Sequence, residues 1–131
     1  YRGDIPLKEG VALYLDRLRR DGVRMCVASA TALPLMKACL DRLGVLDYFD
    51  FLLSCEEVGW GKDRPDVYHE AARRLGASPG EIAVYEDALG AAKTAKMAGY
   101  YVVAVYDGGT QPWEELKKLA DEAIDNWKEE I

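Results

Sequence analysis

Four short apolar segments, none of which alternates with polar residues, constrain this chain more than any other feature of its sequence. They cover residues 25–28, 51–53, 82–85 and 101–105. Continuous apolar runs of this length are typical of strands in parallel sheets that helices cover on both faces. We therefore expect four buried, parallel strands.

Segments with helical spacing of apolar residues lie before, between and after these runs. The first has Leu7, Val11, Leu15 and Leu18 on one face, and the others are predicted to begin or extend over residues 34–43, 65–75, 89–98 and from 112 onward. Proline near the start and glycine just after the end mark several of these helices. The alternation predicts an α/β fold in layers with right-handed crossovers, and because no linker or repeat divides the 131 residues, we expect residues 1–131 to be one domain or part of one.

The composition narrows the class of protein. Half of the residues are hydrophobic and 31% are charged, and the net charge of -6 disfavours a nucleic-acid footprint. No apolar stretch is long enough to span a bilayer, and the first ten residues lack the apolar region of a signal peptide. The three cysteines share no metal-ligand spacing and histidine occurs once, which argues against a disulfide framework or a zinc site. We expect a soluble, cytoplasmic protein that binds neither nucleic acid nor membranes.

Polar residues follow each predicted strand, at the sheet edge where open α/β sheets bind ligands. Glu86 and Asp87 are adjacent carboxylates after the third strand, and oxygen ligands of this kind suit Mg²⁺. An acidic helix start is the alternative interpretation of this pair.

Lys62 and Ser29 are the other candidates. Lys62 lies in a glycine-containing loop just before the helix predicted at Pro65, an arrangement that suits an anion, although a solvated surface lysine has the same pattern. Ser29 directly follows the first predicted strand, where its hydroxyl could equally satisfy local backbone groups. No Gly-x-Ser-x-Gly surrounds Ser29, so a serine hydrolase is not indicated.

Taken in order, these segments resemble the haloacid dehalogenase (HAD) superfamily of phosphohydrolases, in the branch of β-phosphoglucomutase and phosphoglycolate phosphatase. Residues 23–31 (VRMCVASAT) look like the second motif of the family, and residues 47–50 (DYFD) resemble the approach to the next strand. Residues 61–68 (GKDRPDVY) resemble the third motif, with Asp63 in place of its usual first proline. Residues 86–99 (EDALGAAKTAKMAG) resemble the fourth motif.

The resemblance implies a three-layer, Rossmann-like HAD core and Mg²⁺-dependent phosphoryl transfer from a small phosphorylated metabolite through an aspartyl-phosphate. It implies that Asp87 is a metal ligand, with Glu86 supporting the metal directly or through water. It also implies that Lys62 stabilises developing negative charge, and that Ser29 donates a hydrogen bond to the phosphoryl group. Ala30 would contribute to the same phosphate pocket. Phosphatase and phosphomutase remain alternatives.

The first motif of the family, a strand that ends in Asp-x-Asp and carries the nucleophile, has no counterpart in the 131 residues. In the family this strand lies at the middle of the sheet, between the strands that here end at Ser29 and Glu86. We therefore expect the chain to be the C-terminal part of a HAD core, inactive alone, with the central strand and the cap domain supplied by a missing N-terminal segment or by a partner chain. Direct pairing of the two strands is the alternative, and a non-catalytic HAD-like binding or assembly domain is the alternative function.

Overall fold

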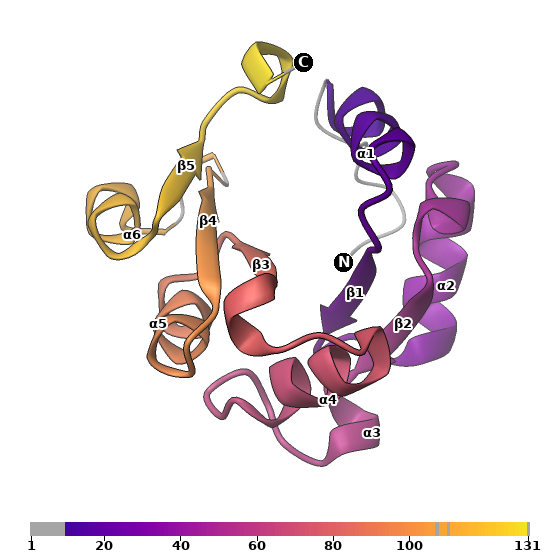
Figure 1. Ribbon diagram of the computed structural model, residues 1–131, viewed down its shortest axis with the longest axis horizontal. Coiled ribbons are helices and arrows are strands. Elements are labelled where there is room, and N and C mark those ends of the chain that lie inside the picture. Colours follow the sequence, from indigo (N-terminus) through magenta and orange to yellow (C-terminus); the bar gives the residue numbers. More distant parts are fainter. Residues whose placement is uncertain (1–9, 107, 110, 131) are drawn as a thin grey trace. The chain divides into compact units, whose positions relative to one another are not determined.

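The computed structural model describes residues 10–106, 108–109 and 111–130. These residues form two compact units, one made of residues 10–59 and 126–130 and the other of Trp60–Asp125. Each unit is an α/β arrangement with a parallel sheet of its own (Figure 1). The α/β class and the parallel strands predicted from the sequence are thus confirmed, while the strands belong to two sheets.

The first unit contains a two-stranded sheet. Strand β1 pairs in parallel with β2, so that Cys26 is opposite Phe51 and Ser29 is opposite Ser54. The elements of this unit are α1 (Val11–Arg20), β1 (Cys26–Ser29), α2 (Leu33–Arg42), η1 (Leu46–Tyr48), β2 (Phe51–Ser54), α3 (Cys55–Val58) and η3 (Trp127–Glu130). The last turn, η3, returns to α1, where the rings of Tyr14 and Trp127 meet edge to face with centroids 5.0 Å apart.

The core of the first unit is built on the inner face of α2. Met36, Leu40 and Val45 are buried, and partly buried side chains from α1, β1, η1 and β2 pack against them. Helix α2 has Pro34 in its first turn and ends before Gly44, whose φ of 75° is a left-handed conformation that glycine adopts at little cost. The face of α2 that carries Met36 and Leu40 is therefore the one that stabilises this unit.

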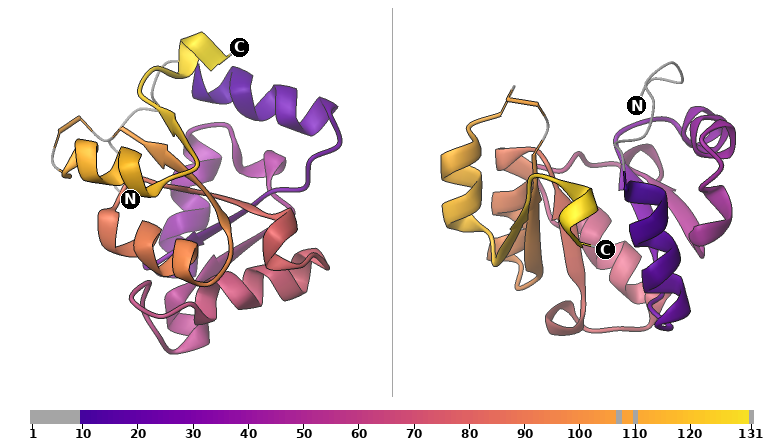
Figure 2. Two further views of the ribbon diagram at one scale, coloured as in Figure 1. Left: turned by 60° about the vertical axis from the view of Figure 1, so that its left-hand side comes forward. Right: turned by 90° about the horizontal axis from the view of Figure 1, so that it is seen from above.

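The second unit contains a three-stranded parallel sheet in the order β3-β4-β5. Its elements are α4 (Asp66–Leu75), η2 (Pro79–Glu81), β3 (Ala83–Glu86), α5 (Leu89–Met97), β4 (Tyr101–Val105), α6 (Trp113–Leu119) and β5 (Glu122–Ile124). Helices α5 and α6 lie side by side against this sheet (Figures 1 and 2). Ala92 and Ala95 of α5 have no exposed surface, and their small side chains allow the helix to pack closely in this unit.

Burial of the strands differs from the sequence prediction in one respect. Val102, Val103 and Ala104 of β4 are buried, whereas Tyr85 of β3 is 38% exposed and Tyr101 at the start of β4 is 40% exposed. The prediction that all the apolar runs are covered on both faces is therefore wrong for β3, which is at the end of its sheet, and also for β1, all of whose residues are only partly buried. Among the described helices, none is long and apolar enough to cross a membrane.

Candidate active site

Ser29 is the last residue of β1, and its hydroxyl oxygen accepts a hydrogen bond from the backbone N–H of Thr31 at 3.1 Å. This bond uses an acceptor site of the hydroxyl and leaves its own hydrogen to donate elsewhere. Ala30 is exposed between these two residues. The turn after β1 therefore presents a hydroxyl donor of the kind that a phosphoryl oxygen accepts.

Ser54, the parallel partner of Ser29, fixes this turn from the neighbouring strand. Its buried hydroxyl donates to the carbonyl oxygen of Thr31 at 2.9 Å and accepts from the backbone N–H of Glu56 at 3.2 Å. The carboxylate of Glu57 accepts from the N–H of Ser54 at 2.9 Å, which completes a capping box at the start of α3. Ser54 was not predicted as a functional residue, although its Ser-x-x-Glu spacing with Glu57 is a sequence signal for this cap.

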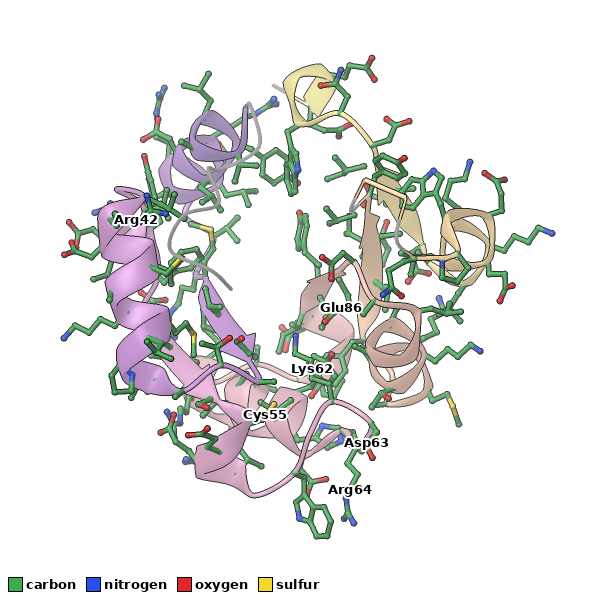
Figure 3. The ribbon with its side chains drawn as sticks, turned by 180° about the vertical axis from the view of Figure 1, so that it is seen from behind. Arg42, Cys55, Lys62, Asp63, Arg64 and Glu86 are labelled. Atoms are coloured by element: carbon green, nitrogen blue, oxygen red, sulfur yellow. The ribbon has the colours of Figure 1, made fainter. Side chains whose placement is uncertain are left out.

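In the second unit, Lys62 and Glu86 form an ion pair. The ammonium nitrogen of Lys62 is 2.9 Å from Oε2 of Glu86, whose side chain is only 7% exposed (Figure 3). Glu86 ends β3 and Lys62 lies in the loop that leads into α4, so the two are 24 positions apart in the sequence. The structure thus brings together two residues that the sequence assigned to one site.

Every oxygen of the buried Glu86 carboxylate has donors. Oε1 accepts from the backbone N–H groups of Asp87 at 3.2 Å and Ala88 at 3.4 Å, while Oε2 accepts from Lys62 and from the hydroxyl of Tyr68 at 3.2 Å. A buried charge is tolerated when it is paired and hydrogen-bonded in this way. The described residues accordingly contain no buried side-chain oxygen or nitrogen that lacks a partner.

Asp87 directly follows Glu86 and is exposed at the carboxyl end of β3. Two adjacent carboxylates fit the chemistry of Mg²⁺, which binds one or two carboxylates and completes its shell with water or phosphate. Within residues 10–106, 108–109 and 111–130 there is no group of three or more histidine, cysteine, aspartate or glutamate side chains close enough to form a complete metal cage. Asp87 therefore fits part of a magnesium site, whereas both oxygens of Glu86 already accept hydrogen bonds from two donors each, so Glu86 fits such a site only through water.

The other charged residues of the Lys62 loop point elsewhere. The guanidinium of Arg64 lies 3.9 Å from the ring centroid of Trp60 and donates to Asp66 at 3.3 Å, and Figure 3 shows Arg64 directed away from Glu86. Trp60 is half exposed beneath this cation, so its ring packs on Arg64 and not in a core. Lys62 is thus the cation that this loop directs to Glu86.

A second buried tyrosine lies next to Tyr68. The ring centroids of Tyr68 and Tyr100 are 6.0 Å apart, and the hydroxyl of Tyr100 is 2.7 Å from Nδ1 of His69. Burial raises the pKa of Tyr100 above its usual value of 10.0, so it remains a neutral phenol at physiological pH. Tyr100 therefore belongs to the packing around the site, where its hydroxyl bonds to His69.

The profile of the haloacid dehalogenase-like hydrolases matches residues 1–99. The chain belongs to this family. Among its relatives, Protein CbbY of Cereibacter sphaeroides is 32% identical over 131 residues, which cover 97% of this chain and 56% of that protein. A β-phosphoglucomutase of Bacillus subtilis (strain 168) is 29% identical over 102 residues, which cover 78% of this chain and 44% of that protein.

Solved HAD structures agree with this assignment. A HAD family hydrolase from Deinococcus radiodurans R1, with bound phosphate and sodium, matches with a TM-score of 0.87 at 25% identity, covering 97% of this chain and 58% of that one. CbbY from Rhodobacter sphaeroides in complex with phosphate matches with a TM-score of 0.83 at 30% identity, covering 96% and 56%. The chain spans between 44% and 58% of the length of these four proteins.

Proposed function

We propose that the protein containing this chain is a Mg²⁺-dependent phosphatase of a small phosphorylated metabolite, or a phosphomutase, that acts through an aspartyl-phosphate. The observation that carries the proposal is the Lys62–Glu86 ion pair at the end of β3, with Asp87 beside it. The membership in the HAD-like hydrolases and the phosphatase and phosphomutase names among the relatives support it.

In this proposal the chain supplies the groups that hold the phosphoryl group. The ammonium of Lys62 stabilises the negative charge that develops on the phosphoryl oxygens, and the hydroxyl of Ser29 donates a hydrogen bond to one of them. Glu86 keeps Lys62 extended toward the strand end, because the carboxylate is itself fixed by backbone N–H donors.

Asp87 would hold the magnesium ion directly, and Glu86 would support it through water, because both oxygens of Glu86 already have protein donors. When bound, Mg²⁺ would neutralise part of the negative charge of the phosphate. The support for these two residues is the donor chemistry of adjacent carboxylates at a strand end.

We further propose that a segment outside these 131 residues, or a partner chain, supplies the nucleophilic aspartate on a central strand. No Asp-x-Asp occurs in the sequence. In the described residues β1 pairs only with β2, and β3 pairs only with β4, so each has one side without a strand neighbour. An added strand would complete the backbone hydrogen bonding of either one.

The test uses the intact protein with p-nitrophenyl phosphate as substrate, with and without Mg²⁺. Lys62→Gln removes the cation, and we expect kcat/KM to fall by about a hundredfold or more, as for the loss of one preorganised oxyanion donor. Lys93→Gln is the matched control, because Lys93 is an exposed lysine on α5 of the same unit. We expect that control to retain full activity.

The outcomes of this test distinguish a phosphoryl-transfer enzyme from a non-catalytic HAD-like domain. Mg²⁺-dependent turnover that depends on Lys62 but not on Lys93 would support the phosphoryl-transfer enzyme. An intact, folded protein that neither hydrolyses the phosphate ester nor binds Mg²⁺ would reject it in favour of a non-catalytic HAD-like domain. Thermal unfolding of both variants shows whether a loss of activity is a loss of folding.

A further inference from the structure

Tyr68 is a buried tyrosine whose hydroxyl reaches the candidate active site. It lies in the first turns of α4 and is 4% exposed, and its hydroxyl oxygen is 3.2 Å from Oε2 of Glu86 and 3.4 Å from the carbonyl oxygen of Ala91. A phenol has one hydrogen to donate, and the charged carboxylate is the closer and stronger acceptor. The hydroxyl of Tyr68 therefore donates to Glu86.

This hydrogen bond ends on the same oxygen that accepts the ammonium of Lys62 at 2.9 Å. Two donors divide the negative charge of that oxygen, so Tyr68 weakens the hold of Glu86 on Lys62. The Lys62 side chain keeps 26% of its surface exposed, so its pairing with Glu86 does not bury it completely. Without the hydroxyl, Glu86 would draw Lys62 closer and would lose one of the contacts that fix its own orientation.

We infer that Tyr68 is a positioning residue, which sets the place and the availability of the Lys62 ammonium by donating to Oε2 of Glu86. This inference rests on the proposed function, because it assigns Lys62 to the phosphoryl group. Tyr68 does not touch the reacting atoms in this account. It acts through Glu86, and its removal should lower the rate of the chemical step more than the binding of substrate.

The fold explains why a tyrosine can serve here. Tyr68 is on the buried face of α4 with Val67 and Ala71, and that helix follows directly from the loop that carries Lys62. The ring fills core space, and only the hydroxyl extends to the end of β3. Phenylalanine would keep the packing and remove the donor, which makes Tyr68→Phe a specific perturbation.

Tyr100→Phe is the matched control. Tyr100 is also buried, at 3% exposure, and its ring is the neighbour of Tyr68, but its hydroxyl bonds to His69 and not to Glu86. Both variants lose one buried phenolic hydroxyl in the same cluster. A merely structural contribution of such a hydroxyl would affect the two variants alike.

The experiment measures kcat and KM of the intact protein with p-nitrophenyl phosphate for both variants. For Tyr68→Phe we expect kcat to fall about tenfold, the size expected for one hydrogen bond to a charged group, with KM changed less than about threefold. For Tyr100→Phe we expect kcat to stay within about twofold of wild type. In a Glu86→Gln background, Tyr68→Phe should have less than about a twofold further effect, because its target is already altered.

Failure of the inference differs from failure of the proposed function. If Lys62→Gln is inactive while Tyr68→Phe is as active as wild type, or if both tyrosine variants lose the same activity, the positioning role of Tyr68 is overturned and the function stands. If wild type has no phosphatase activity, the function is overturned. A crystal structure of the intact protein with the Tyr68 hydroxyl more than 3.5 Å from both Glu86 oxygens would overturn the inference without any variant.

Discussion

Replacing Ser54 with alanine tests whether a buried hydroxyl fixes the turn that follows β1. Ser54 is 1% exposed, donates to the carbonyl oxygen of Thr31 at 2.9 Å and accepts from the N–H of Glu56 at 3.2 Å. The Ser54→Ala variant removes both bonds and keeps the backbone N–H bond to Glu57. The perturbation is therefore confined to one hydroxyl that joins two strand ends and a helix.

The expected loss of unfolding free energy in Ser54→Ala follows from the two hydrogen bonds that the hydroxyl makes. Loss of the helix cap costs about 1 kcal/mol, and loss of the buried hydrogen bond to Thr31 costs about another 1 kcal/mol. A total of about 2 kcal/mol lowers the folding equilibrium constant roughly thirtyfold. For a chain of this size the unfolding midpoint should fall by about 6 °C.

The assay is thermal and urea unfolding of the intact protein, with Ser78→Ala as the control. Ser78 begins η2, and its hydroxyl donates to the carboxylate of Glu81 at 2.8 Å in an exposed position. Water can replace that partner, so we expect the midpoint of Ser78→Ala to fall by well under half of the shift in Ser54→Ala. Equal shifts in the two variants would refute the argument from burial.

Three further predictions concern residues of the second unit, and the last of them uses an exposed leucine of the first unit as its control. Asp87→Asn should weaken Mg²⁺ binding by about tenfold or more in calorimetry, and an unchanged affinity would remove Asp87 from the metal site. The hydrogen bond to Glu122, with smaller contributions from burial and nearby acidic charge, raises the pKa of Tyr101 from 10.0 to about 12. The stabilising effect of that bond should therefore be complete below pH 10 and lost as the pH rises through about 12, and ultraviolet absorbance should show this late ionisation disappear in Tyr101→Phe. Leu116→Ala, at a fully buried position, should cost about 3 kcal/mol of unfolding free energy, whereas Leu13→Ala at an exposed position should cost less than about 0.5 kcal/mol.

The elements with strong local patterns could be predicted from the sequence. Strand β4 has the predicted bounds, Tyr101–Val105, and it lies inside an apolar run of seven residues, 100–106. Strand β5 was missed, since it has three residues and only Ile124 is buried. It is held by tertiary contacts: the backbone and the side chain of Asp121 both bond to Val102, each at 2.8 Å, and Lys96 donates to the same carboxylate. No periodicity in the sequence encodes such contacts.

The residues of the candidate site also fall into those that could be predicted from the sequence and those that could not. Lys62 and Glu86 could be assigned to one site because the order of the motifs places both at strand or loop ends. Tyr68 could not, because its spacing with Val67 and Ala71 reads as an ordinary core face of a helix. Its role depends on where a hydroxyl group at the tip of a core ring points, and only the packing of α4 near the end of β3 determines that.

The unpaired edges of strands β1 and β3 have a practical consequence in the laboratory. Strands β1 and β3 each have one side without a hydrogen-bonded neighbour among the described residues, and Tyr85 adds exposed aromatic surface to β3. Open strand edges of this kind recruit strands from other molecules. A preparation of these 131 residues by themselves should therefore self-associate as its concentration rises, and its elution volume in size-exclusion chromatography should fall on concentration. A soluble peptide with strong strand propensity, added in excess, should compete with that association.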